Sequence, residues 1–294
     1  MPEAQLLIQA TILGLLVGGI YAVMSSGLTL IFGVMRVINI AHGALIVFSA
    51  YLTYWLFTNY QVDPFLSMIL TVPLLFVAGW LLQRLILSRF TENIGPMSVL
   101  STFGLAIALE GLMGFWWSTI FRSVKVSYPW RSFVIGGYYF PFIRLLAFAA
   151  ALLILGLLFL LLTRTKLGRA IRATTQDRRA AQLVGVDVER VAAITFGIGI
   201  ALAAAGGAFM AILFAFFPAT HYLWISKVLA IVVVGGLGSL PGALVGSLIL
   251  GTLESIATVV VDLSWAPIVF YIFLFGTLLI KPEGLFGQRG REGI

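Results

Sequence analysis

Long stretches of this 294-residue chain carry no charged side chain, and this limits its possible folds more than any other feature of the sequence. A helix needs about 20 mostly apolar residues to cross the hydrocarbon core of a bilayer. Runs of that order, broken by at most two acids, lie between Glu3 and Arg36, between Arg36 and Asp63, and over 64–83, 93–121, 145–163, 191–226 and 228–280. The sequence therefore predicts a chain that folds in lipid.

Helix-breaking residues divide the last of these runs. It contains Gly235, Gly236, Gly238, Pro241 and Pro267, which predict two spans plus a broken or re-entrant segment. Each of the other six runs predicts one span. The expected fold is all-α: a polytopic transmembrane helical bundle of about eight spans with broken or re-entrant segments. We expect residues 1–294 to form a single transmembrane domain, with a first span too long to be a removable signal peptide.

Composition excludes several classes of protein. Hydrophobic residues make up 61% of the chain and charged residues 10%, whereas soluble domains have about 45–50% and about 25%. The chain has no cysteine, which excludes disulfides, thiol catalysis and cysteine-held metals, and two histidines do not suffice for a histidine metal cluster. No phosphate-binding Gly-x-x-x-x-Gly-Lys-Ser/Thr loop is present. We therefore expect a non-enzymatic chain with no cofactor, no metal and no ATP site of its own.

The basic residues gather mainly in one loop, residues 164–190, hereafter the basic loop. It contains Arg164, Lys166, Arg169, Arg172, Arg178, Arg179 and Arg190. Cytoplasmic loops hold an excess of Lys and Arg, so this loop is expected inside. The span count places further basic residues on the same side, namely Arg36, Arg84, Arg89, Lys281, Arg289 and Arg291, and leaves Arg122, Lys125, Arg131, Arg144 and Lys227 outside or at the outer interface. The net charge of +7 then reflects topology rather than nucleic-acid binding, and the N-terminus lies outside.

The basic loop contains the pattern of a short helix. Thr174 followed by Asp177 fits a helix start, residues 178–184 are compatible with a helix, and Gly185 can take the left-handed conformation that ends one. Asp187 is placed to cap the next membrane helix. A capped helix between two spans is a firm surface for a partner protein. The alternative is a solvated basic loop attracted to anionic lipid.

Two glycine-rich clusters, residues 27–43 and 235–246, join helix breakers to polar groups. Irregular backbone inside a membrane is tolerated where protein or a watery cavity satisfies it, so interrupted segments in both halves of a chain indicate a transport path. The candidate path residues are Thr29, Asn39, His42, Gly43, Gly235, Gly236, Gly238 and Ser239.

Two acids, Glu110 and Glu254, interrupt apolar spans. Intramembrane acids are costly and are functional hypotheses by default. For both we favour a helix–helix hydrogen bond or a place near the interface over direct substrate contact. His42 is more simply a packing residue than a proton relay.

Three runs carry a family resemblance. Residues 27–43 (GLTLIFGVMRVINIAHG), 168–187 (GRAIRATTQDRRAAQLVGVD) and 234–243 (VGGLGSLPGA) resemble, in the same order, the signatures of the branched-chain amino acid permeases of ABC importers. The resemblance extends from about residue 14 to residue 251. The short N-terminus is more similar to the LivH-type subunit than to the longer LivM-type subunit.

This resemblance implies a type II-like permease in the bacterial cytoplasmic (inner) membrane. Its partners would be a second, LivM-like permease subunit, two cytoplasmic ATPases that bind the ATP, and an external substrate-binding protein. The helix around residues 175–185 would sit in a cleft of an ATPase. The residues implied in this coupling are Arg169, Arg172, Gln176, Asp177, Ala180, Ala181, Gly185 and Asp187.

The substrate and the energy source leave alternatives open. Related permeases also serve urea, short amides and aromatic acids, and no residue here separates leucine from urea. A self-sufficient secondary transporter, with Glu110, Glu254 or His42 relaying ions, is a second reading. A membrane enzyme is disfavoured because no clustered catalytic set is seen.

Overall fold

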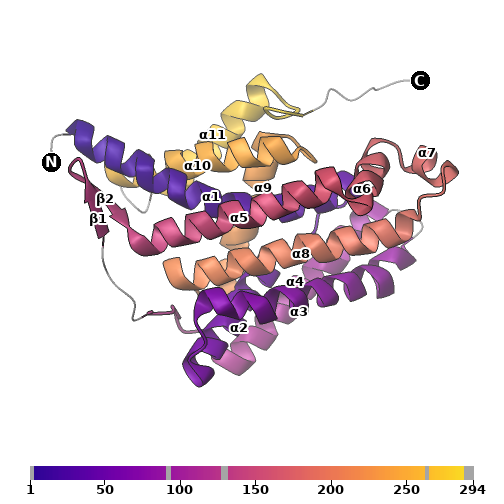
Figure 1. Cartoon of the computed structure of the whole chain (residues 1–294), viewed down its shortest axis with the longest axis horizontal. Coiled ribbons are helices and arrows are strands. Elements are labelled where there is room, and N and C mark those ends of the chain that lie inside the picture. The colour runs from indigo at the N-terminus through magenta and orange to yellow at the C-terminus, as the bar shows by residue number, and fades with distance from the viewer. Residues whose placement is uncertain (1–2, 91–93, 127–131, 262–264, 288–294) are drawn as a thin grey trace.

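The computed structural model describes residues 3–90, 94–126, 132–261 and 265–287 (Figure 1). The expected positions of Arg131, Arg289 and Arg291 lie outside these residues. The described residues form eleven α-helices, two 3-10 turns, η1 (Leu87–Arg89) and η2 (Pro218–Thr220), and one antiparallel hairpin, β1 (Ser132–Ile135) with β2 (Tyr138–Pro141). The helices are α1 (Glu3–Met35), α2 (Ala41–Tyr60), α3 (Pro64–Leu85), α4 (Ile94–Trp117), α5 (Phe142–Arg164), α6 (Lys166–Gln176), α7 (Arg178–Leu183), α8 (Val188–Leu213), α9 (His221–Gly235), α10 (Leu240–Val260) and α11 (Ala266–Ile280).

Eight helical segments in the described part of the chain are long and apolar enough to cross a membrane. They are built on α1, α2, α3, α4, α5, α8, α9 and α10, while α11 is a shorter apolar helix. The predicted all-α, polytopic fold of about eight spans is therefore confirmed. The chain is a multi-pass membrane protein.

The sequence placed the helix boundaries after residue 190 wrongly. It expected one span within 191–226 and Lys227 at the outer interface. In the structure α8 ends at Leu213, α9 begins at His221, and Lys227 is buried inside α9. The break at residues 214–220 contains no charge that could have marked it, although Pro218 starts its 3-10 turn.

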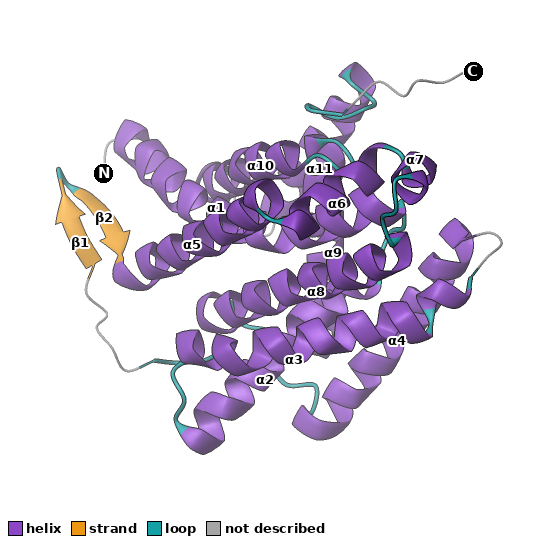
Figure 2. Ribbon diagram, turned by 45° about the vertical axis from the view of Figure 1, so that its right-hand side comes forward, coloured by secondary structure: helices purple, strands orange, loops and turns teal. Residues whose placement is uncertain are grey.

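Helices α8 and α9 lie between two groups of helices, α1, α5 and α10 on one side and α2, α3 and α4 on the other (Figure 2). Small residues allow this close packing. Gly14 and Gly18 of α1 lie against the α10 backbone near Gly251, and Gly207 of α8 lies against α2. The Ser49 hydroxyl of α2 also donates to the Ala204 carbonyl of α8, at 2.7 Å.

Replacing Gly207 by Ala is expected to destabilise the chain by about 1–3 kcal/mol, the usual cost of overpacking a core. Its new Cβ would collide with the carbonyl oxygen of Ile46 and crowd Ser49. The thermal unfolding midpoint of the detergent-purified chain measures this. Gly156→Ala in α5 is the matched control, because no atom of the described residues, apart from the nearby backbone of its own helix, lies within 4 Å of its Cβ position. Equal midpoints for the two variants would contradict the packing assigned to Gly207.

Two helices begin inside the bundle rather than at its ends. The first turn of α2 lies beside the middle of α1, where the His42 Nε2 atom is 2.9 Å from the Met24 carbonyl oxygen. Residues 36–40 therefore turn back from the end of α1 into the bundle. The start of α9 lies against Gly43, whose Cβ position faces the His221 carbonyl. The N-termini of α2 and α9 thus meet in the interior, and the two helices run in opposite directions.

The segment after α11 returns to the end of α9. The backbone N–H groups of Leu285 and Phe286 donate to the carbonyls of Val234 and Gly235, at 2.7 and 3.0 Å. Gly236, with a φ of 102°, lies against the Gly287 backbone, so a side chain at residue 236 would strike this segment. The turn between α9 and α10 is therefore covered by residues 284–287.

Candidate functional site

The candidate path residues lie mostly inside the chain. Thr29, Asn39 and His42 are fully buried, and the Thr29 hydroxyl and both polar atoms of the Asn39 amide lack hydrogen-bond partners in the described structure. Gly43 and Gly235 are buried at helix contacts with α9 and α10. Their role in a path stays a prediction, and in the single chain none of these five residues lies on an open surface.

The two glycine-rich clusters meet at one end of the bundle. The Cβ position of Gly33 lies 3.6 Å from both the Gly238 carbonyl oxygen and the Thr175 side chain of α6. Gly236 and Gly238 have φ angles of 102° and 81°, which favour glycine, and the Ser239 hydroxyl accepts from the Gly242 N–H to cap α10. The break expected between α9 and α10 is therefore present, and it lies beside α1 and α6.

The basic loop folds into two short helices. Thr165 caps α6, because its hydroxyl accepts from the Gly168 N–H at 2.9 Å. Asp177 caps α7 by accepting from two backbone N–H groups, and Asp187 caps α8 by accepting from the Arg190 N–H at 3.0 Å. Gly185 has the expected left-handed conformation, with a φ of 85°. The loop is a chain of capped helices rather than a solvated tether.

The expected helix start at Thr174 is wrong. Thr174 is buried within α6, and its hydroxyl donates to the Ala170 carbonyl at 2.8 Å. The pattern of Thr174 and Asp177 is real in the sequence, but Asp177 is itself the cap, because it satisfies N–H groups of the residues that follow it.

The exposure of α7 changes the expected docking face. Ala180 is exposed, whereas Ala181 is buried against its own chain and cannot contact a partner in this conformation. Leu183 and Val184 are 89% and 79% exposed, and the prediction missed them. Two adjacent large apolar residues just before Gly185 were the available signal.

The polar residues expected to dock are all exposed, and one of them also binds its own chain. The exposed residues are Arg169, Arg172, Gln176, Asp177 and Asp187. The Arg172 guanidinium also donates to the Leu162 carbonyl near the end of α5. Arg172 thus holds α6 against the preceding span.

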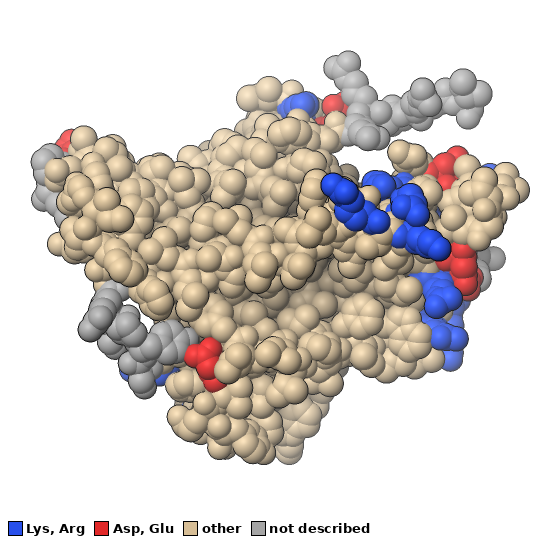
Figure 3. Space-filling model, in the orientation of Figure 1, with Lys and Arg blue, Asp and Glu red and all other residues tan. Residues whose placement is uncertain are grey.

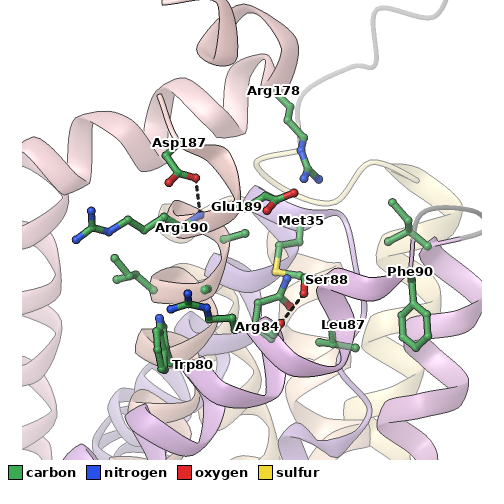
Figure 4. A pocket seen from close by; sticks show the side chains of 15 residues that line it. Met35, Trp80, Arg84, Leu87, Ser88, Phe90, Arg178, Asp187, Glu189 and Arg190 are labelled. Carbon is green, nitrogen blue, oxygen red and sulfur yellow. Dashed lines mark hydrogen bonds between the residues drawn. The ribbon is translucent and has the colours of Figure 1, made fainter. Parts of the chain in front are cut away.

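Most basic side chains visible in Figure 3 gather over α6, α7 and their neighbours, at one end of the molecule. A cavity of about 680 Å³ opens at this end between α3 and the start of α8 (Figure 4). Its walls carry Arg84, which stacks 5.1 Å from the Trp80 ring, and Arg178, Glu189 and Arg190. A second cavity of about 410 Å³ lies between residues 33–36 on one side and residues 174–179 on the other. Arg36, Arg84 and the basic loop therefore share one end, as the span count predicted.

Both intramembrane acids contact α9. The Glu110 carboxylate of α4 lies 3.0 Å from His221 Nε2. The Glu254 carboxylate of α10 lies 2.5 Å from Lys227 Nζ and accepts from the Tyr21 hydroxyl at 2.9 Å. Both acids thus lie in helix–helix contacts, and their partners were not identifiable from the sequence.

Known proteins match this chain over nearly its whole length. The family model described as the permease component of the branched-chain amino acid transport system matches residues 10–280. The permease protein BraD of the high-affinity branched-chain amino acid transport system of Pseudomonas aeruginosa is 28% identical, over 98% of both chains. The corresponding LivH protein of Escherichia coli is 25% identical over 94% of both chains. A probable LivH permease of Methanocaldococcus jannaschii is 30% identical over 89% of this chain and 86% of the relative. The eight-span fold, the three sequence runs and these matches together show that the chain belongs to the family of branched-chain amino acid transport permeases.

Proposed function

We propose that this chain is one of two membrane subunits of an ABC importer that carries branched-chain amino acids into the cytoplasm. The second permease subunit, two cytoplasmic ATPases and an external binding protein complete the importer in the cytoplasmic membrane of a bacterium. ATP binds to the ATPases, and the chain itself needs no cofactor or metal. Relatives named as branched-chain amino acid permeases support this substrate class.

The observation that carries the proposal is the exposed tip of α7. A short helix with a fixed start at Asp177 and a fixed end at Gly185 presents Leu183 and Val184 to solvent. Large exposed apolar side chains rimmed by polar residues mark protein interaction sites. The tip lies at the basic end, which is expected in the cytoplasm. Because the sequence has no phosphate-binding loop, an ATPase bound there would supply the energy.

Movement of α7 has a short route to the membrane helices. Asp177 caps α7 directly after α6, and Thr175 of α6 lies near Gly33 of α1, which in turn faces Gly238. Rigid elements that contact one another in series can carry a displacement between sites. The proposed ATPase motion would therefore reach the ends of α1, α9 and α10 without crossing a flexible linker.

Reconstitution tests the proposal. In proteoliposomes the chain alone should not accumulate leucine, whereas addition of the second permease subunit, the ATPases, ATP and the binding protein should give uptake. Leucine flux driven by an ion gradient through the purified chain alone would contradict it and favour a secondary transporter. A binding protein that carries urea, a short amide or an aromatic acid instead would contradict the substrate class and leave the importer architecture standing.

A further inference from the structure

Glu110 is an acid that remains partly open on the surface of a membrane helix. Its side chain is 28% exposed, although its partner His221 is only 2% exposed. The neighbouring Tyr222 of α9 is 45% exposed. One side chain of α9, His221, thus holds the carboxylate in place while one side of it remains accessible.

This carboxylate lies deep in the membrane-spanning region. Helix α9 begins at His221 and runs 15 residues to the basic end, roughly 22 Å at the usual rise per residue. In the other direction, α4 continues for seven residues beyond Glu110 and ends at Trp117, roughly 10 Å away. An acid at this depth faces a bundle interior or a watery cavity, because contact with lipid is costly. We therefore expect the open side of Glu110 to face a polar path rather than lipid.

The surroundings of Glu110 combine apolar surface with a helix N-terminus. Ile107, one turn away on α4, is 48% exposed and Leu223 of α9 is 41% exposed. Helix α9 begins at His221, the partner of Glu110, and its N-terminus has no side-chain cap. Helix N-termini carry partial positive charge and attract anions.

The other intramembrane acid is already neutralised. Glu254 is paired with Lys227 and bonded to Tyr21, and its side chain is 18% exposed. Lys227 also lies 5.5 Å from the centres of the Tyr21 and Trp224 rings. This acid has a lysine as its counter-charge, whereas the contact of Glu110 within the described residues is with a histidine, His221.

We propose that Glu110 binds the α-ammonium group of an amino acid as it passes through the translocation path. Ile107 and Leu223 then offer apolar contact to a branched side chain, and the N-terminus of α9 favours the substrate carboxylate. This inference rests on the proposed function and sharpens its substrate class. Urea and short amides carry no cation and gain little from a held carboxylate at this depth.

Glu110→Gln tests the inference in the complete importer, reconstituted in vesicles with radiolabelled leucine. The amide keeps the size of the side chain and an oxygen acceptor, but it removes the charge. Leucine uptake is expected to fall at least about tenfold, the scale of a lost hydrogen bond to a charged group. Ser101→Ala is the matched control, because its partly exposed hydroxyl on the same helix donates, within the described residues, only to the Met97 carbonyl. This variant should keep leucine uptake, basal ATP hydrolysis and thermal stability unchanged.

Each outcome of this experiment decides a different point. Uptake by Glu110→Gln equal to that of the wild type overturns the ammonium site and leaves the proposed function standing. A parallel loss of stability or of basal ATP hydrolysis shows a structural role and also overturns the site. A wild-type importer that carries urea or a neutral amide but not leucine removes the proposed substrate and the ammonium site together.

Discussion

Replacing Lys227 by Met is expected to destabilise the folded chain by about 3–5 kcal/mol, the usual cost of removing one partner of a buried ion pair. Lys227 is buried in α9, and its ammonium group lies 2.5 Å from the Glu254 carboxylate. The methionine fills a similar volume, so the loss is electrostatic: Glu254 keeps its bond from Tyr21 but loses its counter-charge. The free energy of unfolding in mixed detergent micelles measures the effect.

The double variant Lys227→Met with Glu254→Gln is the control for this prediction. The neutral amide removes the unpaired charge and still accepts a hydrogen bond from the Tyr21 hydroxyl. We therefore expect the double variant to recover most of the stability that the single variant loses. If the double variant is no more stable than Lys227→Met alone, the loss comes from the packing of α9 and not from the unpaired carboxylate.

Replacing both Leu183 and Val184 by Asp is expected to reduce ATP-driven uptake by about 100-fold or more, because two carboxylates would have to be buried in an apolar interface. This prediction depends on the proposed function. Both side chains are almost fully exposed in the single chain, so its own stability should not change. Co-purification with the ATPases, uptake of leucine and thermal stability are measured on the same preparation.

The conservative pair Leu183→Met and Val184→Ile is the matched control. It keeps apolar surface at the tip of α7 and should keep both ATPase binding and uptake. Normal uptake by the Asp variant would show that no partner covers this tip. A loss of uptake with normal ATPase binding would place the defect after docking, in the transmission of the motion.

Charge spacing predicted the membrane helices well, because a charge inside a bilayer is costly and marks most span ends. It failed where a break carries no charge. Residues 191–226 form one uncharged run, yet Pro218 and the extended residues before it separate α8 from α9 inside that run. Lys227 misled the prediction for the opposite reason, since Glu254 lets this lysine lie within a span.

The candidate site was predictable where a local backbone rule decides the structure. Asp187 as a cap and Gly185 as a left-handed residue follow from nearest neighbours in the sequence. Burial and long-range partners do not follow from nearest neighbours in the sequence. The sequence could not show that Ala181 faces inward while Leu183 faces outward, or that Glu110 would meet His221, 111 residues away.

The hydrogen bonds from Leu285 and Phe286 to the last carbonyls of α9 have a practical consequence for anyone who expresses this protein. Those carbonyls would otherwise end a helix without a partner. An affinity tag or a fluorescent fusion should therefore be joined beyond residue 287. A shortened gene that stops at the end of α11 would remove these hydrogen bonds from the turn at Gly236 and loosen the end of the bundle at which that turn lies.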